Sequence, residues 1–491
     1  MLSADTIFPH ETEHWRRINM RKVAHLAGAE SIHNLYNRHW PRINSIRFRH
    51  TLTNYKDGRV ESFAPVSEWQ FLQHWLSKKF VILDPVLIRE IEAILNPTYD
   101  LIDELMARID GINLSELSDQ DLALIFIDVM DYPMGEIYRL NVVQIEYSLN
   151  YALHSILEKY ESSPEDRNLL LSKLIAPGEL TVAQEEEVEF SKIIRKARGI
   201  DAASPYDNQD ILKLFLKHIT VFSPKHCAYG ELPPSEEDYL KKYQDMFTSG
   251  NSLLSNAQAI KNLAEQRDES ERLLSKINDQ GLAQLCRLMA RIGVFRDKNK
   301  AKLGETVVRR LKIMDEIALR TGVPRSNLDW YLISEIVTLL DTGQHLSNSH
   351  LKARQKDGVR FERSEDVTSG VRAIENNASK NRSNIKHLSG ICASSGIIEG
   401  SVKVIFDKSD KKKMRTGDIM VAIGTDFDLI EIMNQSAGII TEEGGLLSHA
   451  SVVSRELNKP CLIGVEGATS ILKDGDRVTL DAVNGHVVIK R

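Results

Sequence analysis

The chain of 491 residues is 42% hydrophobic and 27% charged, which is typical of a globular protein with about two to four domains. Its net charge of −6 gives no reason to expect a nucleic acid or an anionic membrane as a partner. The sequence has no apolar signal segment at its start and no run of about 18 apolar residues, so we expect a cytoplasmic protein. Its four cysteines are far apart, which favours reduced thiols and gives no reason to expect a metal site.

Residues 1–97 form an aromatic-rich segment that contains four of the five tryptophans. Within it, residues 45–63 alternate around Asp57-Gly58, a dipeptide typical of hairpin turns. Arg47 and Arg49 lie among the aromatic residues of the first predicted strand. They could form a charged rim around a substrate pocket, or they could be solvated arginines on a packed hairpin, and both interpretations stay open.

Residues 98–354 show helical periodicity and almost no sign of strands. The periodicity predicts a helix from Ser118 that Pro133 interrupts, a core helix at 142–157, and charged helices from 185, at 255–276 and at 281–293. Another helix is expected to end at Gly322. We therefore expect a helical domain, to which the N-terminal hairpin belongs.

Basic side chains near the end of this region are candidates for binding an anion. Arg296 and Lys300 are four residues apart, so they share one face of a helix. Arg354 is a further candidate in the substrate pocket. The alternative, solvated surface charges, remains open for these residues.

Residues 355–389 contain few large apolar side chains and are rich in Asn, Ser, Lys and Arg. This composition predicts a flexible linker between the helical domain and a last domain at 390–491. An ordinary solvated loop between domains is the alternative.

A strand, a turn and a short helix follow one another in the last domain. Ile439–Thr441 reads as the end of a buried strand, and Gly444-Gly445 allows a sharp turn close to a ligand. Ser448 is a suitable N-cap for a helix whose apolar face contains Ala450, Val453 and Leu457. Asn458 and Pro460 then end the helix before another buried strand.

His449 is therefore expected in the first turn of a helix, directly after a glycine turn. The unpaired amides and the helix dipole at that position favour negative charge and disfavour an imidazolium ion. A neutral imidazole is a nucleophile, and the same amides can hold a phosphoryl group bound to it. A histidine that only packs in a turn is the alternative.

Several further motifs surround this histidine in a fixed order. They are Gly396-Ile-Ile-Glu-Gly400, Gly417-Asp-Ile-Met-Val421, Leu446-Leu-Ser-His-Ala-Ser451, Asp474-Gly-Asp-Arg-Val478 and Asn484-Gly-His-Val487. Together they resemble the phosphohistidine swivelling domain of PEP-utilising enzymes, such as PEP synthase, pyruvate phosphate dikinase and rifampin phosphotransferase. One departure is Thr425-Asp-Phe427, where that family often has Thr-x-Pro.

The resemblance implies a fold and a set of roles. The fold class it implies is a mostly α-helical N-terminal region joined to a C-terminal α/β (β/β/α) swivelling domain. His449 would carry the phosphoryl group, while Thr441, Gly444, Gly445 and Ser448 would bind or orient it. The helical region is similar to the substrate-binding or linker region of the family, where an Arg-x-x-x-Lys pair lies near the transferred group. Arg296 and Lys300 would therefore neutralise its charge.

The family's phosphoryl donors are an ATP-grasp domain or a PEP-binding barrel, and the sequence shows the signature of neither. We therefore expect no cofactor bound directly to this chain, with ATP or PEP and Mg²⁺ on a separate ATP-grasp nucleotide-binding subunit or PEP-dependent partner. The expected activity is phosphotransfer from His449 to a small-molecule acceptor. One alternative is a non-catalytic phosphocarrier, regulatory or partner-binding protein, and another is a degenerate member whose histidine is never phosphorylated.

Overall fold

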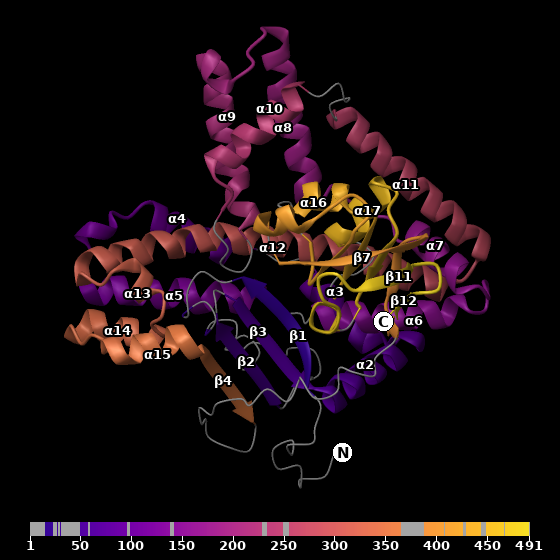
Figure 1. The fold of residues 1–491 in the computed structure, drawn as a ribbon, viewed down its shortest axis with the longest axis horizontal. Coiled ribbons are helices and arrows are strands. Elements are labelled where there is room, and N and C mark those ends of the chain that lie inside the picture. The colour runs from indigo at the N-terminus through magenta and orange to yellow at the C-terminus, as the bar shows by residue number, and fades with distance from the viewer. Residues whose placement is uncertain are drawn as a thin grey trace.

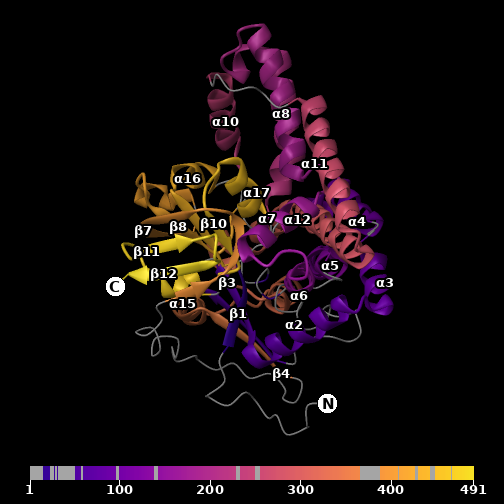
Figure 2. The ribbon, with the colours of Figure 1, turned by 90° about the vertical axis from the view of Figure 1, so that its right-hand side faces the viewer.

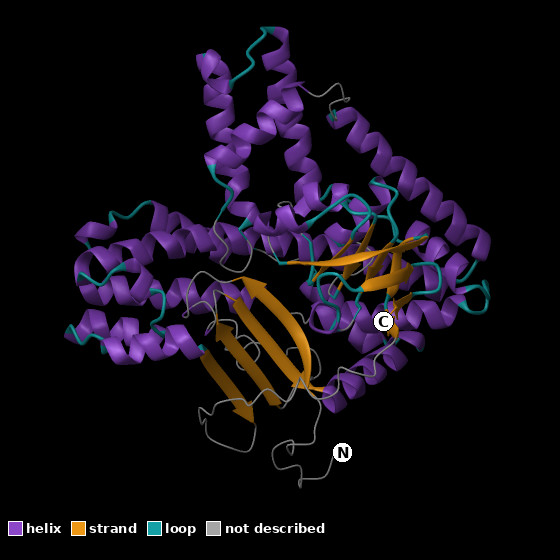
Figure 3. Cartoon of the chain, viewed as in Figure 1, coloured by secondary structure: helices purple, strands orange, loops and turns teal. Residues whose placement is uncertain are grey.

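A computed structural model describes residues 15–22, 27, 30, 50–56, 59–95, 99–137, 142–227, 233–248, 255–364, 387–406, 408–425, 429–442, 448–465 and 467–490. The described residues form a helical body with a protruding arm, a four-stranded sheet and a C-terminal α/β domain (Figures 1 and 3). This is the fold class expected from the sequence. No helix within these ranges is long and apolar enough to span a bilayer.

The helical body is organised around α12 (Gln280–Thr321), a continuous helix of 42 residues. Asp279 caps its start by accepting a hydrogen bond from the amide of Leu282, and Gly322 ends it with a φ of 68°. The predicted end of a helix at Gly293 is therefore wrong, because α12 continues through this residue. No proline interrupts α12, and an interior glycine costs only about 1 kcal/mol of helix stability.

Two apolar clusters pack against α12. Around its first half lie α2 (Val66–Val81), α3 (Pro85–Ile94), α6 (Val142–Leu157), α7 (Pro164–Leu174) and α11 (Asn256–Ile277). Around its second half lie α4 (Asp100–Asp110), η2 (Leu114–Glu116), α5 (Asp119–Ile137), α13 (Arg325–Leu328), α14 (Ile333–Thr342) and α15 (Asn348–Asp357). The expected interruption at Pro133 is wrong, since α5 continues to Ile137. Pro133 cannot donate to the carbonyl of Val129, and Arg310 of α12 supplies the missing donor, with its Nε 2.9 Å from that oxygen.

The arm consists of α8 (Val182–Gly199), α9 (Gln209–Phe222) and α10 (Glu236–Thr248), which rise above the body in Figures 1 and 2. The short 3₁₀ turns η3 (Pro205–Asp207) and η4 (Ser223–His226) flank α9. The buried carboxylate of Glu186 ties these elements together, because it lies 2.6 Å from His226 Nε2, 3.4 Å from His218 Nε2 and 3.0 Å from Lys242 Nζ. Burial alone would raise the pKa of Glu186, but these partners hold that pKa well below its usual range.

The smaller sheet confirms the predicted hairpin and extends it. Strands β2 (His50–Lys56) and β3 (Arg59–Pro65) pair antiparallel, with Lys56 opposite Arg59. Strands β1 (Trp15–Lys22) and β4 (Val359–Ser364) complete the order β1-β3-β2-β4.

The first ten residues of the expected 355–389 linker are therefore not a linker. They form the last turn of α15 and strand β4, whose alternating Val359 and Phe361 suit an antiparallel partner of β2. Residues 387–389 belong to strand β5 of the C-terminal domain, and residues 365–386 lie outside the described part of the chain.

The C-terminal domain is built on an eight-stranded sheet with the order β5-β12-β11-β7-β8-β9-β10-β6. Its strands are β5 (His387–Ser389), β6 (Ile391–Ser394), β7 (Ile397–Ile405), β8 (Ile419–Ala422), β9 (Gly438–Thr441), β10 (Cys461–Ile463), β11 (Arg477–Asp481) and β12 (His486–Lys490). Its helical elements are η8 (Lys408–Lys413), α16 (Ile430–Gln435), α17 (His449–Glu456) and α18 (Ala468–Ile471). Strands β7 to β10 run parallel, so the loops that follow β8, β9 and β10 meet at one edge.

This domain is docked on the helical body. Its buried Ala393 and Ala450 belong to the same apolar cluster as Leu149 of α6 and Leu174 of α7. Strand β6 lies against α7, and α16 lies below the arm, where Glu431 pairs with Lys241 of α10 (Figure 2). The contact is largely apolar, so separating the domain from the body exposes hydrophobic surface.

Replacing Gly304 with alanine should destabilise the protein. Its added Cβ would lie 2.2 Å from the carbonyl oxygen of Pro224 in η4, so the joint between the arm and α12 must shift. The clash should outweigh the gain in helix propensity and cost about 1–3 kcal/mol, measured by urea unfolding. Gly199→Ala is the matched control, because nothing lies within 4 Å of its Cβ. Equal stability of the two variants would contradict the proposed packing.

Candidate functional site

The predicted strand–turn–helix–strand unit around His449 is confirmed. Strand β9 ends at Thr441, α17 begins at His449, and β10 follows at Cys461. Ser448 is the N-cap, and its hydroxyl accepts a hydrogen bond from the Ser451 amide at 3.4 Å. Asn458 has the left-handed conformation expected of it, with a φ of 50°.

The side chains on α17 have separate tasks. Ala450 is buried, and Val453 and Leu457 pack against the same apolar cluster, which fixes the helix on the sheet. Arg455 donates from Nε to the Ser451 carbonyl at 2.9 Å, so it helps to hold the helix. His449 is only partly buried at the first position of the helix, where the dipole favours an anion.

The hydroxyl of Thr425 lies 2.8 Å from Nδ1 of His449. Thr425 follows β8, so this contact joins the loop after β8 to the start of α17. If Nδ1 carries the proton and donates it to Thr425 Oγ1, Nε2 has the lone pair that can attack phosphorus. The structure therefore offers a way to select the reactive tautomer.

The remaining site candidates of the C-terminal domain are Thr441, Gly444 and Gly445. Thr441 is fully buried, and its carbonyl accepts a hydrogen bond from Val465 at 2.9 Å, so it fixes the loop after β10. Gly444 and Gly445 lie outside the described residues, so their expected role stays a prediction.

Tyr147 of α6 connects the helical body to the loops around His449. Its hydroxyl donates a hydrogen bond to the carbonyl of Glu442 at 3.4 Å. The same oxygen packs closely against Gly464, since a Cβ added to this glycine would lie 3.2 Å from it. The Glu442 carboxylate in turn accepts two hydrogen bonds of 2.6 Å from the amide and hydroxyl of Thr469. Trp69 packs edge-on against the Tyr147 ring at 6.0 Å. The loop edge of the parallel strands therefore faces α6.

Arg296 lies next to this contact. It forms an ion pair with the largely buried Glu146, the residue before Tyr147. Lys300 is one turn further along α12 and half-buried. The structure thus places the predicted Arg296–Lys300 face against α6, the helix that touches the C-terminal domain.

Arg354 does not lie near the contact between α6 and the C-terminal domain. Arg354 makes two hydrogen bonds of 2.7 Å to Glu335 and one of 2.8 Å to the Trp330 carbonyl, so it joins α15 to α14 around the far half of α12. Arg47 and Arg49 lie outside the described residues. Arg59 of the same hairpin does reach the C-terminal domain, where its guanidinium lies 4.5 Å from the centre of the Phe406 ring.

Thr425, Tyr147 and Glu442 were not among the predicted site residues. The Thr425-Asp-Phe427 motif could have indicated Thr425. A threonine that follows a parallel strand lies at the same edge of the sheet as the histidine. Tyr147 carries no signal in the sequence, since it is one aromatic residue on a core helix.

The C-terminal domain has known relatives. Residues 414–485 match the family described as PEP-utilising enzyme, mobile domain. Phosphoenolpyruvate synthase of Pyrococcus furiosus is 48% identical over 100 residues, which are 20% of this chain and 12% of that protein. The uncharacterized phosphotransferase YvkC of Bacillus subtilis is 38% identical over 103 residues, which are 21% of this chain and 12% of YvkC.

A probable phosphoenolpyruvate synthase of Methanothermobacter thermautotrophicus is 32% identical over 203 residues, 39% of this chain and 29% of that protein. Because 39% of the chain exceeds the C-terminal domain, this similarity reaches into the helical body. The chain spans between 12% and 29% of the length of these three relatives. Its C-terminal domain is thus similar to the mobile domains of PEP-utilising enzymes.

Removing the hydroxyl at Thr425 should change the tautomer of His449. In Thr425→Val, Nδ1 loses a hydrogen bond worth about 1 kcal/mol, so the ratio of the two neutral tautomers should shift about fivefold away from Nδ1–H. The ¹⁵N shifts of the His449 ring report this ratio, and His449→Gln identifies its signals. Thr248→Val, whose hydroxyl bonds only the helix backbone, is the control. An unchanged ratio would refute the role given to Thr425.

Truncating Tyr147 should loosen the docked domain. We expect faster amide hydrogen exchange in 391–394 and 461–465 of Tyr147→Ala, because the ring and its hydrogen bond hold these segments against α6. Tyr151→Ala is the matched control on the same helix, since Tyr151 is 60% exposed. The same exchange rates in both variants would show that Tyr147 does not hold the domain.

Proposed function

We propose that His449 is transiently phosphorylated by a separate enzyme and passes the phosphoryl group to a small organic acceptor bound at the helical body. The observation that supports this most directly is the contact between Thr425 and His449 Nδ1 at the start of α17. The match of residues 414–485 to the mobile domain of PEP-utilising enzymes supports the same chemistry.

The proposed reaction has two displacements. First, Nε2 attacks the terminal phosphorus of the donor, an N–P bond forms, and the P–O bond to the donor breaks. The amides at the start of α17 stabilise the anionic group, while Thr425 keeps the remaining ring proton on Nδ1. Next, an oxygen of the acceptor attacks the same phosphorus, the N–P bond breaks, and its electron pair returns to Nε2 as the neutral imidazole leaves, while the proton of a hydroxyl acceptor is released to water.

The docked arrangement corresponds to the second displacement in this proposal. The loop edge of the parallel strands faces α6, and Arg296 lies one helix away with Glu146. Arg296 and Lys300 would balance the charge that develops on the transferred group. For the first displacement the domain must leave α7 and α6, which requires the apolar contact to open.

The donor is proposed to be a separate ATP-grasp subunit using ATP and Mg²⁺, or a PEP-dependent enzyme. Either donor would meet His449 only in the undocked position. The alternative function is a phosphocarrier or regulatory protein that has no acceptor of its own. The continuous apolar cluster between domain and body does not distinguish the two functions, because both require the domain to undock.

The proposal predicts an acid-labile, base-stable phosphate on His449. Labelled phosphoramidate, a chemical donor for histidine, and labelled ATP with candidate ATP-grasp proteins should each label the chain. His449→Ala should remove at least nine tenths of the label, whereas His486→Ala, an exposed histidine of the same domain, should retain it.

The outcomes separate the three functions. Failure of both donors to label His449 would overturn the proposal and favour the degenerate family member. Label that persists with every hydroxyl or carboxylate acceptor offered would favour the phosphocarrier. Label that one acceptor discharges in the wild type, and more slowly in Arg296→Gln, would establish the transferase.

A further inference from the structure

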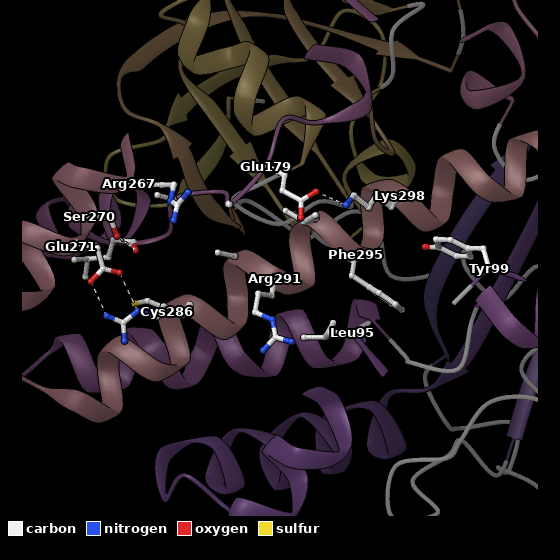
Figure 4. A pocket seen from close by; sticks show the side chains of 16 residues that line it. Leu95, Tyr99, Glu179, Arg267, Ser270, Glu271, Cys286, Arg291, Phe295 and Lys298 are labelled. Carbon is white, nitrogen blue, oxygen red and sulfur yellow. Dashed lines mark hydrogen bonds and ion pairs between the residues drawn. The ribbon is translucent and has the colours of Figure 1, made fainter. Parts of the chain in front are cut away.

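A cavity lies on the side of α12 that faces α11. Its volume is about 670 Å³, within the range of pockets that bind small molecules. Besides α12 and α11, it is lined by the connection between α7 and α8 and by the residues after α3 (Figure 4). Neither the motifs of the C-terminal domain nor the proposed phosphotransfer gives this cavity a role.

The cavity and the proposed phosphoryl site lie on opposite faces of α12. At 100° per residue, Arg287, Arg291 and Lys298 share one face, while Arg296 and Lys300 lie roughly 160° away from it. The helix itself therefore separates the two sites. Any ligand in the cavity would bind independently of the group carried by His449.

The lining combines an apolar floor with a basic rim. Leu95, Leu174 and Phe295 supply apolar surface, and Phe295 is only 3% exposed. Four basic side chains face two acidic ones in the lining, which leaves an excess of positive charge; the basic ones are Arg267, Arg287, Arg291 and Lys298, and the acidic ones are Glu179 and Glu271. The combination suits a molecule with an apolar part and a negative charge.

The basic residues differ in how firmly they are held. Arg287 donates two hydrogen bonds of 3.1 and 2.7 Å to the carboxylate of Glu271, and this pairing holds the pKa of Glu271 below its usual range. Arg291 makes one exposed contact of 3.2 Å with Glu92, and exposed pairs of this kind are worth about 0–1 kcal/mol. Within the described residues, Arg267 makes no hydrogen bond or ion pair. Arg267 and Arg291 can therefore turn to an incoming anion at little cost.

We propose that this cavity binds a small amphiphilic anion, with its carboxylate or phosphate at Arg267 and Arg291 and its chain or ring against Leu95, Leu174 and Phe295. Glu271 of α11 pairs with Arg287 of α12. Arg267 and Arg291 lie one turn away from this pair on the same two helices, so the two arginines line the same end of the cavity and one anion can bridge them. The apolar part of the ligand would be transferred from water to the apolar surface of the cavity, which favours binding.

Gly178 gives a way to close the cavity without disturbing the core. It lines the cavity, and nothing lies within 4 Å of the position of an added Cβ. A leucine there should occupy the space of the ligand's apolar part. Gly199, at the end of α8, has equally open surroundings but does not line the cavity, so Gly199→Leu is the matched control.

Titration calorimetry with octyl phosphate, octanoate, octylammonium and inorganic phosphate tests the proposal on the full chain. Both octyl anions should bind, octylammonium should not, and inorganic phosphate should bind at least tenfold more weakly than octyl phosphate. Gly178→Leu should weaken octyl phosphate at least tenfold, and Arg267→Ala about fivefold, with the melting temperature unchanged. Gly199→Leu should bind like the wild type.

Three results would overturn the proposal. They are equal binding of octylammonium and octanoate, wild-type affinity in Gly178→Leu, and no binding of either octyl anion. If octanoate binds and octyl phosphate does not, the site takes a carboxylate and the phosphate arm is rejected. Retained affinity in His449→Ala confirms that the cavity does not depend on the phosphohistidine site.

Discussion

The geometry of the proposed site depends on one hydrogen bond, between the hydroxyl of Thr425 and Nδ1 of His449. It joins loops that follow different parallel strands, so it forms only when β8, β9 and β10 are in register. The N-cap at Ser448 and the buried Ala450 fix the helix from the other side. A whole sheet is thus used to hold one imidazole in one orientation.

Helix α12 positions the side chains of two sites in the helical body. One face packs with α6, whose Glu146 and Tyr147 lead to Arg296 and to the loops of the C-terminal domain. Its opposite face forms the floor of the cavity with α11. A single rigid helix thus contributes to both sites and keeps them apart, because the residues that line them point in opposite directions from its axis.

The sequence predicts local features well and contacts between distant segments poorly. The strand, N-cap, helix and left-handed Asn458 around His449 depend on neighbouring residues, and all were predicted correctly. The contact of Tyr147 with Glu442 joins residues almost 300 positions apart, and nothing in either local sequence marks it. Strand β4 was missed for the same reason, since a strand becomes recognisable only beside its partner β2. Helix α12 was divided because Gly293 was interpreted as a helix end, although no proline follows it and the helix continues to Thr321.

The position of β4 sets a limit on how far His449 can travel. Ser364 is anchored in the sheet of the body and His387 in the sheet of the C-terminal domain, which leaves 22 residues between two fixed points. A fully extended chain of that length spans about 75 Å at most. In the proposed transfer, a donor must therefore present its phosphate within that span of the end of β4, extended by the distance from His387 to His449 across the C-terminal domain.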